Sequence, residues 1–439
     1  MKTKEELKNF SKIELVNNTL ESQNKIEELE KELIKYKNSN TPPSANKHIK
    51  GDLKLKNKTG KRGAPKGHKG KTRIQTPTET QVVDTNICPE CGSHNLKDEQ
   101  IFNRTIEEFE EPEPPKTKRV LIHKKKCKHC GHKFIPHHNT TPLKGKFGIN
   151  IMVFVIFMKF LLRGVLRKSA TFLETGFALK IVPASVNAII KRVADACDIE
   201  YENLKSKIRN SSIVYVDETS FYVLNKKCWV WVFRTSTDML LVIRDSRGSK
   251  VPKSILGENY CGTIICDCWR AYDCFKKAII QRCWSHLLRK SRELKDTIIG
   301  KNFHNKLKNL FAQIKEFNMI EHTQEEREEK YIQMTDELRK IIKYYSRYDE
   351  LKSVIGYINN NLGNWFSCVR VEGIEPTNNF AEQAIRETVV VRKIIGCFRS
   401  ETGKENYERI ASLISTWQLQ EKDLKTELKK TLIKNLCFC

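Results

Sequence analysis

The 439-residue sequence has few acidic side chains relative to its basic ones. Asp and Glu number 53 against 79 Lys and Arg, which gives a formal net charge of +26. A surplus of positive charge this large indicates a polyanionic partner, above all nucleic acid. An anionic membrane surface is the competing partner, and the apolar content of the sequence bears on that alternative.

The sequence also has little that favours export or membrane insertion. Its first ten residues, MKTKEELKNF, contain no apolar core of a signal peptide. The most apolar run, residues 149–166, is interrupted by Lys159 and Arg163, so its unbroken part is too short to span a bilayer. We therefore expect one buried helix over this run and a cytoplasmic, nucleoid-associated protein.

Fifteen cysteines without an export signal favour reduced thiols and metal ligands over a disulfide scaffold. Four of them lie in or beside apolar runs, as is typical of small buried residues: Cys266, Cys268, Cys274 and Cys283. Two CxxC motifs, each followed by glycine, predict a zinc-binding domain over residues 80–140, because four thiolates complete a tetrahedral Zn²⁺ shell. The expected ligands are Cys88, Cys91, Cys127 and Cys130. A vestigial site that has kept its cysteines without metal is the alternative.

Residues 1–40 are predicted to form an N-terminal helix. Apolar side chains recur at coiled-coil spacing over a short seam, at Ile26, Leu29, Leu33 and Tyr36. The same spacing fits a single amphipathic helix packed against its own protein, so a weak dimerisation helix and a monomeric one both stay open.

Residues 41–79 are predicted to form a basic, flexible arm. Between Lys47 and Arg73 eleven basic residues are opposed only by Asp52, and apolar residues are scarce. This charge suits salt-sensitive, largely sequence-independent contact with DNA phosphates. A plain solvated linker is the alternative, but it does not explain the bias toward one sign. The residues expected to contact DNA include Lys61, Arg62, Lys66 and Lys69.

Residues 141–210 have helical periodicity throughout. Two helical segments separated near Gly176 and by Val182–Pro183, with Ser185 as the expected cap of the second, are similar to a helix-turn-helix. In that motif the second helix enters the major groove of DNA. Generic helix pairs have the same pattern, so this DNA contact stays an alternative.

Residues 211–286 change to the period of β-strands. Three strands that look antiparallel (IVYVDETSFYV, CWVWVFRT, MLLVIRD) precede a short helix and a fourth strand, GTIICD. Asp217 ends or nearly ends the first strand, and Asp267 ends the fourth. If these two strands lie side by side, both carboxylates meet at one edge, a ribonuclease H-like layout that suits Mg²⁺ or Mn²⁺ and phosphodiester chemistry.

A third carboxylate is expected from the helix that follows EPTNN, at Glu382. A capping box between Asn379 and Glu382 explains the same residues without chemistry. Arg386, one helical turn further on, could hold a phosphate or orient Glu382. The carboxylates that compete for these roles are Glu218, Asp273, Glu375 and Glu387; strand alternation points Glu218 away from Asp217.

An ordered set of motifs carries a resemblance to a known family. It comprises NSNTPPS, RGAPKGHKG, the paired CxxC motifs, VDET, DCWRAY, CWSHLLRK, NNFAEQAIR and ASLISTWQLQEKDL. The sequence resembles a transposase of the insertion sequence 66 family, a prokaryotic group with a DDE-type, ribonuclease H-like core. It departs from the family pattern at Trp269, where tyrosine is usual, and at Gln383, where arginine is common.

The resemblance implies Asp217, Asp267 and Glu382 as the metal-binding triad and places His286 near the active site. His286 has a bland alternative as a core histidine at a strand end. The implied fold is multidomain α+β, with an all-helical insertion over residues 287–370 and completion of the core over residues 371–439. The expected function is DNA transposition by metal-dependent cleavage and strand transfer, with a homo-oligomer on DNA and accessory proteins as partners. The alternatives are a non-enzymatic zinc-containing DNA-binding protein and a nuclease without strand transfer. Terminal repeats, target preference and oligomeric state stay undetermined.

Overall fold

The computed structural model describes residues 76–97, 99–106, 112–135 and 140–437, together with Gln23, Lys25 and Ile26. By its internal contacts the chain divides into two compact units, one of Met1–Pro42 with Lys116–Cys439 and one of Pro43–Pro115. The described residues of the smaller unit form turns and extended segments.

Two predictions from the sequence lie outside the described residues. The first is the N-terminal helix with its apolar seam, of which only three residues are described. The second is the basic arm with Lys61, Arg62, Lys66 and Lys69. Both remain predictions.

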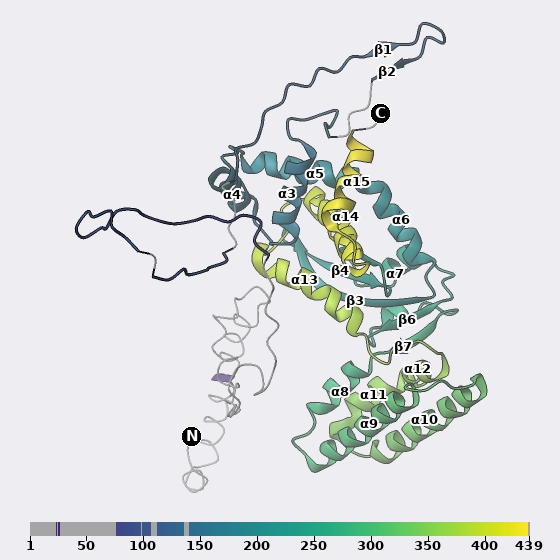
Figure 1. Ribbon diagram of the computed structural model, residues 1–439. Helices are drawn as coiled ribbons and strands as arrows, with labels where there is room; N and C mark the ends of the chain where they lie inside the picture. The colour runs from purple at the N-terminus through teal and green to yellow at the C-terminus, as the bar shows by residue number, and fades with distance from the viewer. Residues whose placement is uncertain are drawn as a thin grey trace. The chain divides into compact units, whose positions relative to one another are not determined.

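A five-stranded mixed sheet organises the larger unit (Figure 1). Its order is β5-β4-β3-β6-β7; β3 pairs antiparallel with β4 and parallel with β6. The predicted adjacency of the first and fourth strands is therefore confirmed. A fifth strand, β7, extends the parallel part of the sheet beyond β6, and the sequence analysis does not predict it. The strands are β3 (Ile213–Val223), β4 (Lys226–Arg234), β5 (Met239–Arg244), β6 (Thr263–Cys266) and β7 (Ile279–Arg282).

One face of the sheet is covered by a thick layer of helices. Because side chains alternate along a strand, Val214 and Val216 of β3 point to this face, where they join one apolar cluster with helices from both ends of the unit. A cluster of this size removes a large apolar area from water and anchors the sheet. The helices are α3 (Ile149–Phe160), α4 (Leu166–Phe177), α5 (Pro183–Ala196), α6 (Asp198–Arg209), α7 (Lys250–Leu256), α14 (Glu401–Leu419) and α15 (Leu424–Leu436).

The opposite face is covered mainly by α13 (Asn379–Ile395), which runs across β3 and β4 (Figure 1). Phe221 and Val223 of β3 point to this face and pack with Ile385 and Val391 of α13. The helix that carries Glu382 thus lies on the face reached by the odd-numbered residues of β3, which include Asp217.

The edge strand β5 is closed by side chains of α14. Its backbone N–H groups at Met239, Leu241 and Ile243 donate to the side chains of Thr416, Ser412 and Glu408 at 3.0, 2.9 and 2.7 Å. These acceptors are spaced four residues apart, which places them on one helix face. An edge strand with free N–H groups would otherwise invite pairing with another chain.

The apolar run 149–166 forms a shorter helix than predicted. Helix α3 ends at Phe160, Arg163 adopts a left-handed φ of 56°, and α4 begins at Leu166. The turn depends on Gly164, whose N–H donates to the Met158 carbonyl at 2.8 Å and where a Cβ would lie 2.8 Å from that oxygen. Among the described helices, none combines the length and the apolar character needed to cross a membrane.

Helices α4 and α5 are the pair predicted between residues 141 and 210. The break spans residues 178–182, and Ala178 ends α4 in the left-handed region. Ser185 is the cap that the sequence predicts for α5, and this prediction is wrong. The helix begins at Pro183 with Val182 as N-cap and no side-chain cap bond, since proline is well suited to the first helical position.

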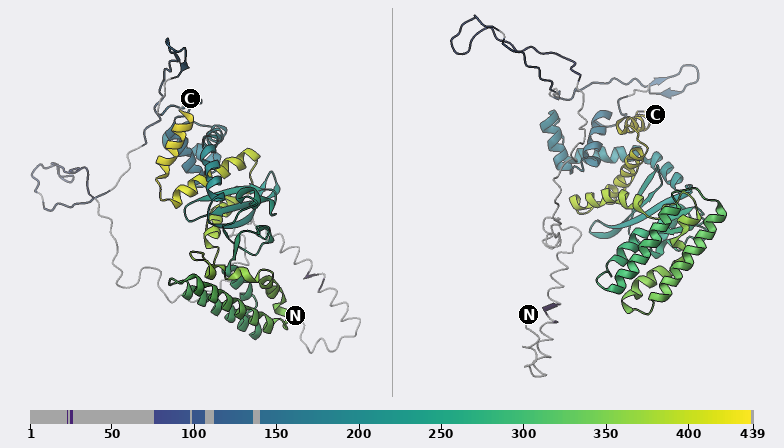
Figure 2. Two further views of the ribbon diagram at one scale, coloured as in Figure 1. Left: turned by 90° about the vertical axis from the view of Figure 1, so that its right-hand side faces the viewer. Right: turned by 60° about the horizontal axis from the view of Figure 1, so that its bottom comes forward.

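Residues 284–370 form the expected helical insertion with a core of its own. Figure 2 shows these helices as a layer beyond one end of the sheet. Trp284, Phe303, Leu338 and Trp365 are fully buried there. The helices are α8 (Trp284–Arg292), α9 (Ile298–Phe317), α10 (Gln324–Tyr345), α11 (Lys352–Asn359) and α12 (Ser367–Arg370).

Candidate functional site

Asp217 lies within β3, and Asp267 directly follows the adjacent parallel strand β6. The pairing of Tyr215 with Ile265 means that two further residues along each strand bring Asp217 opposite Asp267. Asp217 does not end its strand as predicted, because β3 continues to Val223 through its pairing with β4. Strand β6 ends at Cys266, so the two aspartates lie where the shorter strand stops and leaves β3 exposed on that side.

The carboxyl of Asp217 is buried and surrounded by other acids. Burial, followed by the charges of Glu218 and Asp267, raises its pKa to about 8, and Glu382 adds to the effect. Its Oδ1 accepts the Glu218 N–H at 3.0 Å, the one favourable contact, which lowers the pKa only in part. A carboxyl with this environment favours any cation that can offset the gathered negative charge.

Glu218 points to the opposite face of β3, as alternation predicts. Its carboxylate accepts the Tyr272 hydroxyl at 2.5 Å and pairs with Arg247, with nitrogen–oxygen distances of 2.7 and 2.9 Å. The Arg247 guanidinium in turn stacks on Trp229 and Trp269, 4.7 and 4.1 Å from the ring centroids. Glu218 is therefore satisfied by neutral and cationic partners and supports the strand from behind.

The carboxylate of Asp273, like that of Glu218, is engaged in an ion pair. It follows the short 3₁₀ turn Arg270–Tyr272 and pairs with the fully buried Arg282, which also donates to the Asp267 carbonyl at 2.6 Å. Arg282 thereby holds the backbone of Asp267 in place. Its side chain is a buttress of the site that the sequence analysis does not identify, because arginine at a strand end is usually exposed.

Glu382 lies in the first turn of α13 and faces the start of α8. The helix has Asn378 as its N-cap and no side-chain cap bond, so the capping box between Asn379 and Glu382 is wrong. The Asn378 side-chain amide instead donates to the Val216 carbonyl at 2.8 Å. The Asn378 backbone N–H donates to the Cys283 thiol at 3.1 Å. These bonds tie the helix start to β3 and to α8, next to Asp217.

Three side chains of α8 and its N-cap contact the Glu382 carboxylate. Oε1 lies 3.9 Å from the Cys283 thiol and 3.4 Å from His286 Nδ1, and Oε2 lies 3.5 Å from Arg289. His286 is the third residue of α8, so it is not a histidine at a strand end. Cys283, expected to be a plain buried residue, lies in this cluster.

Arg386 is exposed on α13, one turn beyond Glu382. Within the described part of the chain it has no ion-pair partner, and Arg289 takes the place beside Glu382 that was considered for it. Among the competing carboxylates, Glu387 forms a bidentate pair with Arg163 at 2.6 and 2.7 Å. Arg289 was missed because nothing in its local sequence shows which helix it faces.

The two CxxC motifs lie in different compact units and each forms a tight knuckle. In each the glycine has positive φ and donates its N–H to the carbonyl of the first cysteine, at 2.9 Å for Gly92 and 3.0 Å for Gly131. The pKa of Cys88 is lowered mainly by the backbone N–H of Cys91, and the pKa of Cys127 mainly by the backbone N–H of Cys130. Both knuckles thus favour the thiolate, which is the form that binds Zn²⁺.

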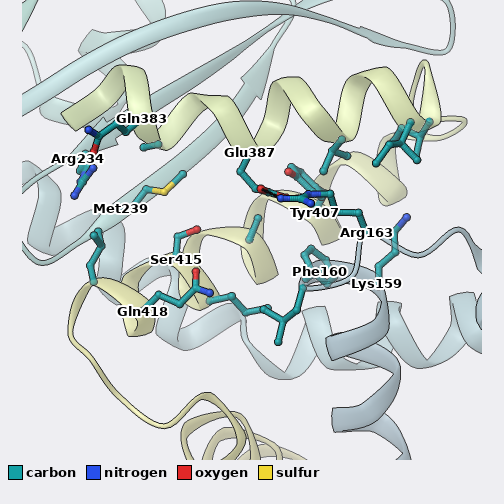
Figure 3. A pocket seen from close by; sticks show the side chains of 18 residues that line it. Lys159, Phe160, Arg163, Arg234, Met239, Gln383, Glu387, Tyr407, Ser415 and Gln418 are labelled. Atoms are coloured by element: carbon teal, nitrogen blue, oxygen red, sulfur yellow. Dashed lines mark hydrogen bonds and ion pairs between the residues drawn. The ribbon is translucent and has the colours of Figure 1, made fainter. Parts of the chain in front are cut away.

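A cavity of about 560 Å³ lies on the other side of α13, between that helix, α14 and the end of α3 (Figure 3). Gln383 and Arg234 lie near one another at one end of it, and the Arg163–Glu387 pair spans its middle. Burial lowers the pKa of Lys159 at the far end. The cavity is separate from the carboxylate cluster, since Glu382 is not among its lining residues.

The residues at the strand edge fit a divalent cation. Carboxylate oxygens suit Mg²⁺ or Mn²⁺, and the pKa of Asp217 is raised first by burial and then by the charges of Glu218 and Asp267, an effect that a bound cation would oppose. Asn378 Oδ1, fully buried, has no hydrogen-bond partner among the described residues. Among the described residues, Asp217, Asp267 and Glu382 are not a group whose ligand atoms all lie within 4.8 Å of one another, so an ion at this edge would have to draw the three carboxylates together.

A comparison with protein-family models identifies the family of the chain. The model of the transposase IS66 family matches residues 144–406, more than half of the chain. The protein belongs to the IS66 family of transposases. A search of the curated proteins gave no match.

Proposed function

We propose that the protein is a DNA transposase that cleaves element ends in a divalent-metal-dependent reaction and joins them to target DNA. The observation that supports the proposal is the parallel pairing of β3, which contains Asp217, with β6, which Asp267 follows, together with the position of α13 on the face to which Asp217 points. Family membership supports an enzyme acting on DNA. The sheet order supports the ribonuclease H-like assignment of this core.

In the proposed site the chain's own groups hold charge and position. Mg²⁺ or Mn²⁺, when bound, would activate the attacking oxygen and stabilise the leaving oxygen of an in-line phosphodiester displacement. Asp217 and Asp267 supply carboxylate oxygens from the strands, and Glu382 supplies a third from α13. Arg289, beside Glu382, fixes that carboxylate, and His286 lies within reach of the same oxygen. Arg386, exposed and unpaired within the described residues, is a candidate phosphate contact.

Other parts of the chain would bind DNA or stabilise the fold. The basic arm with Lys61, Arg62, Lys66 and Lys69 is the proposed non-specific DNA contact, and α4 with α5 is a second candidate. The four CxxC cysteines are proposed to share one structural Zn²⁺. We also propose a homo-oligomer on DNA, with accessory proteins as further partners.

A strand-transfer assay with a labelled element end tests the function. The end sequence is taken from the inverted repeats that flank the gene. A transposase gives both a cleaved 3′ end and a joined product with target DNA. Cleavage without joined product indicates a nuclease, and binding without either product indicates a non-enzymatic DNA-binding protein; both outcomes contradict the proposal.

Metal analysis tests the zinc assignment. The purified protein should contain about one zinc per chain, and the Cys88→Ser, Cys91→Ser double variant should lose it. If the double variant retains all its zinc, the two knuckles do not share the metal.

A further inference from the structure

We infer that Cys283, His286 and Glu382 form a second metal site, specific for Zn²⁺ or a similar thiol-binding divalent ion. Among the described residues, this is the group whose three potential ligand atoms all lie within 4.8 Å of one another. The site is distinct in ligand chemistry from the proposed Mg²⁺ site, since sulfur and imidazole nitrogen select Zn²⁺ whereas Mg²⁺ requires oxygen.

The distances fit one ion held between the three side chains. Tetrahedral Zn²⁺ with the usual bond lengths places a nitrogen and an oxygen ligand about 3.3–3.5 Å apart, and a sulfur and an oxygen ligand about 3.5–3.7 Å apart. His286 Nδ1 lies 3.4 Å from Glu382 Oε1, within that range. The Cys283 thiol lies 3.9 Å from the same oxygen, so a small side-chain rotation closes the set.

The surroundings of the three side chains bear on how they could bind an ion. His286 Nδ1 is buried and has no hydrogen-bond partner among the described residues, so its lone pair is free to bind an ion. The Asn378 backbone N–H donates to the Cys283 sulfur at 3.1 Å, and this contact offsets part of the rise in the thiol pKa that burial causes. Glu382 Oε2 is held by Arg289, which leaves Oε1 directed toward the thiol and the imidazole.

Three protein ligands leave the fourth tetrahedral position open, as in exchangeable rather than purely structural zinc sites. An ion at this position would engage Glu382, the carboxylate that the proposed function assigns to Mg²⁺. Zn²⁺ would therefore inhibit Mg²⁺-dependent cleavage by competing for Glu382. The inhibition rests on the proposed function, whereas the binding does not.

Zinc content of the full chain tests the binding. Wild type, Cys283→Ser, His286→Ala and the control Cys368→Ser are equilibrated with excess Zn²⁺, desalted and analysed for zinc per chain. Cys368 is a matched control because it is also buried but belongs to the core of the helical insertion. We expect wild type and Cys368→Ser to hold one zinc more than the other two.

Two safeguards keep the test decisive. Circular dichroism identifies folded variants, and His286→Ala, in which a quarter-exposed side chain is shortened, decides the question if Cys283→Ser does not fold. Equal zinc contents in wild type and the folded site variants would overturn the inference, as would the loss of one zinc in Cys368→Ser.

The regulatory consequence is measured separately, with Mg²⁺-dependent cleavage as the readout. Zn²⁺ should lower the wild-type rate at least tenfold, and the ratio of rates with and without Zn²⁺ should move toward one in Cys283→Ser. Equal ratios in both proteins would contradict competition at Glu382. If no cleavage occurs at all, the proposed function fails, while the zinc count still decides the binding.

Discussion

Glu382 and Glu408 lie on consecutive helices, α13 and α14, that pack against the same sheet, yet their surroundings differ in kind. Glu408 accepts the Ile243 N–H at 2.7 Å and pairs with Arg244 at 2.9 Å, and the Tyr201 hydroxyl lies 3.4 Å away. Glu382 faces a thiol and an imidazole, contributes to the raised pKa of Asp217, and has a single arginine at 3.5 Å.

The difference shows that Glu408 is fully provided with donors, whereas the partners of Glu382 leave it suited to the role of metal ligand proposed for it. Burial raises the pKa of Glu408, but Arg244 and the Ile243 N–H oppose the effect, so the group closes the edge strand. Around Asp217, burial and the charges of Glu218, Asp267 and Glu382 all raise the pKa, and the Glu218 N–H opposes them only in part. Groups kept in an unfavourable state at a cleft are characteristic of functional sites.

The largest effect is expected from Glu382→Gln, which keeps the size of the side chain and removes its charge. Divalent-metal-dependent cleavage of an element end should fall by about 100-fold or more, as when other electrostatic contributors to a transition state are lost. Thermal unfolding should change little. The matched control is Glu387→Gln on the same helix, whose exposed pair with Arg163 contributes little. Comparable cleavage by Glu382→Gln and Glu387→Gln would move the third carboxylate elsewhere.

The converse effect is expected from Glu408→Ala. Removal of the acceptor leaves the Ile243 N–H unsatisfied and should lower the free energy of unfolding by about 1–3 kcal/mol. Cleavage measured well below the unfolding temperature should persist. Ser412→Ala, which removes the acceptor of the neighbouring Leu241 N–H, provides a milder comparison in denaturant titration. A Glu408→Ala protein that is fully stable but inactive would reverse the roles of the two glutamates.

A smaller effect concerns the pH dependence of stability. Because the pKa of Asp217 is raised to about 8, the folded protein holds a proton that the unfolded chain has released above the ordinary aspartate pKa. Stability of the metal-free protein should therefore fall as pH rises toward about 8. Asp217→Asn should remove this dependence, so its gain in stability over wild type should be larger at pH 8 than at pH 5, by at most about 1.4 kcal/mol per pH unit.

Thermal unfolding at the two pH values measures this difference. The half-exposed Asp336 on α10, paired with Arg339, provides the control substitution Asp336→Asn. Equal pH profiles for wild type and Asp217→Asn would mean that burial and the neighbouring acids do not raise the pKa of this carboxyl.

The strand pattern was enough to predict that β3 and β6 are neighbours and that Glu218 points to the face opposite Asp217; the second prediction follows from the two-residue period of a strand. It did not show that β3 continues past Asp217, since that depends on pairing with β4. Ser185 was mistaken for a cap because Pro183 can begin a helix by itself.

The surroundings of Glu382 could not be predicted. Cys283 is separated from it by 99 positions, and their approach depends on how α8 and α13 start against β3. Arg289 and Arg282 were missed for the same reason: their partners are chosen by tertiary packing. Motif order located the helix of Glu382. The capping box predicted between Asn379 and Glu382 does not form; the N-cap is Asn378, whose side chain donates to the Val216 carbonyl.

Asp217, Asp267 and Glu382 are proposed to bind one divalent cation. Mn²⁺ binding measured by electron paramagnetic resonance, on full-length protein without added Zn²⁺, tests it most directly. We predict that Mn²⁺ binds wild type, Glu387→Gln and Glu408→Ala alike, and that affinity falls at least tenfold in Asp217→Asn and in Glu382→Gln. Unchanged Mn²⁺ affinity in Asp217→Asn would contradict the account.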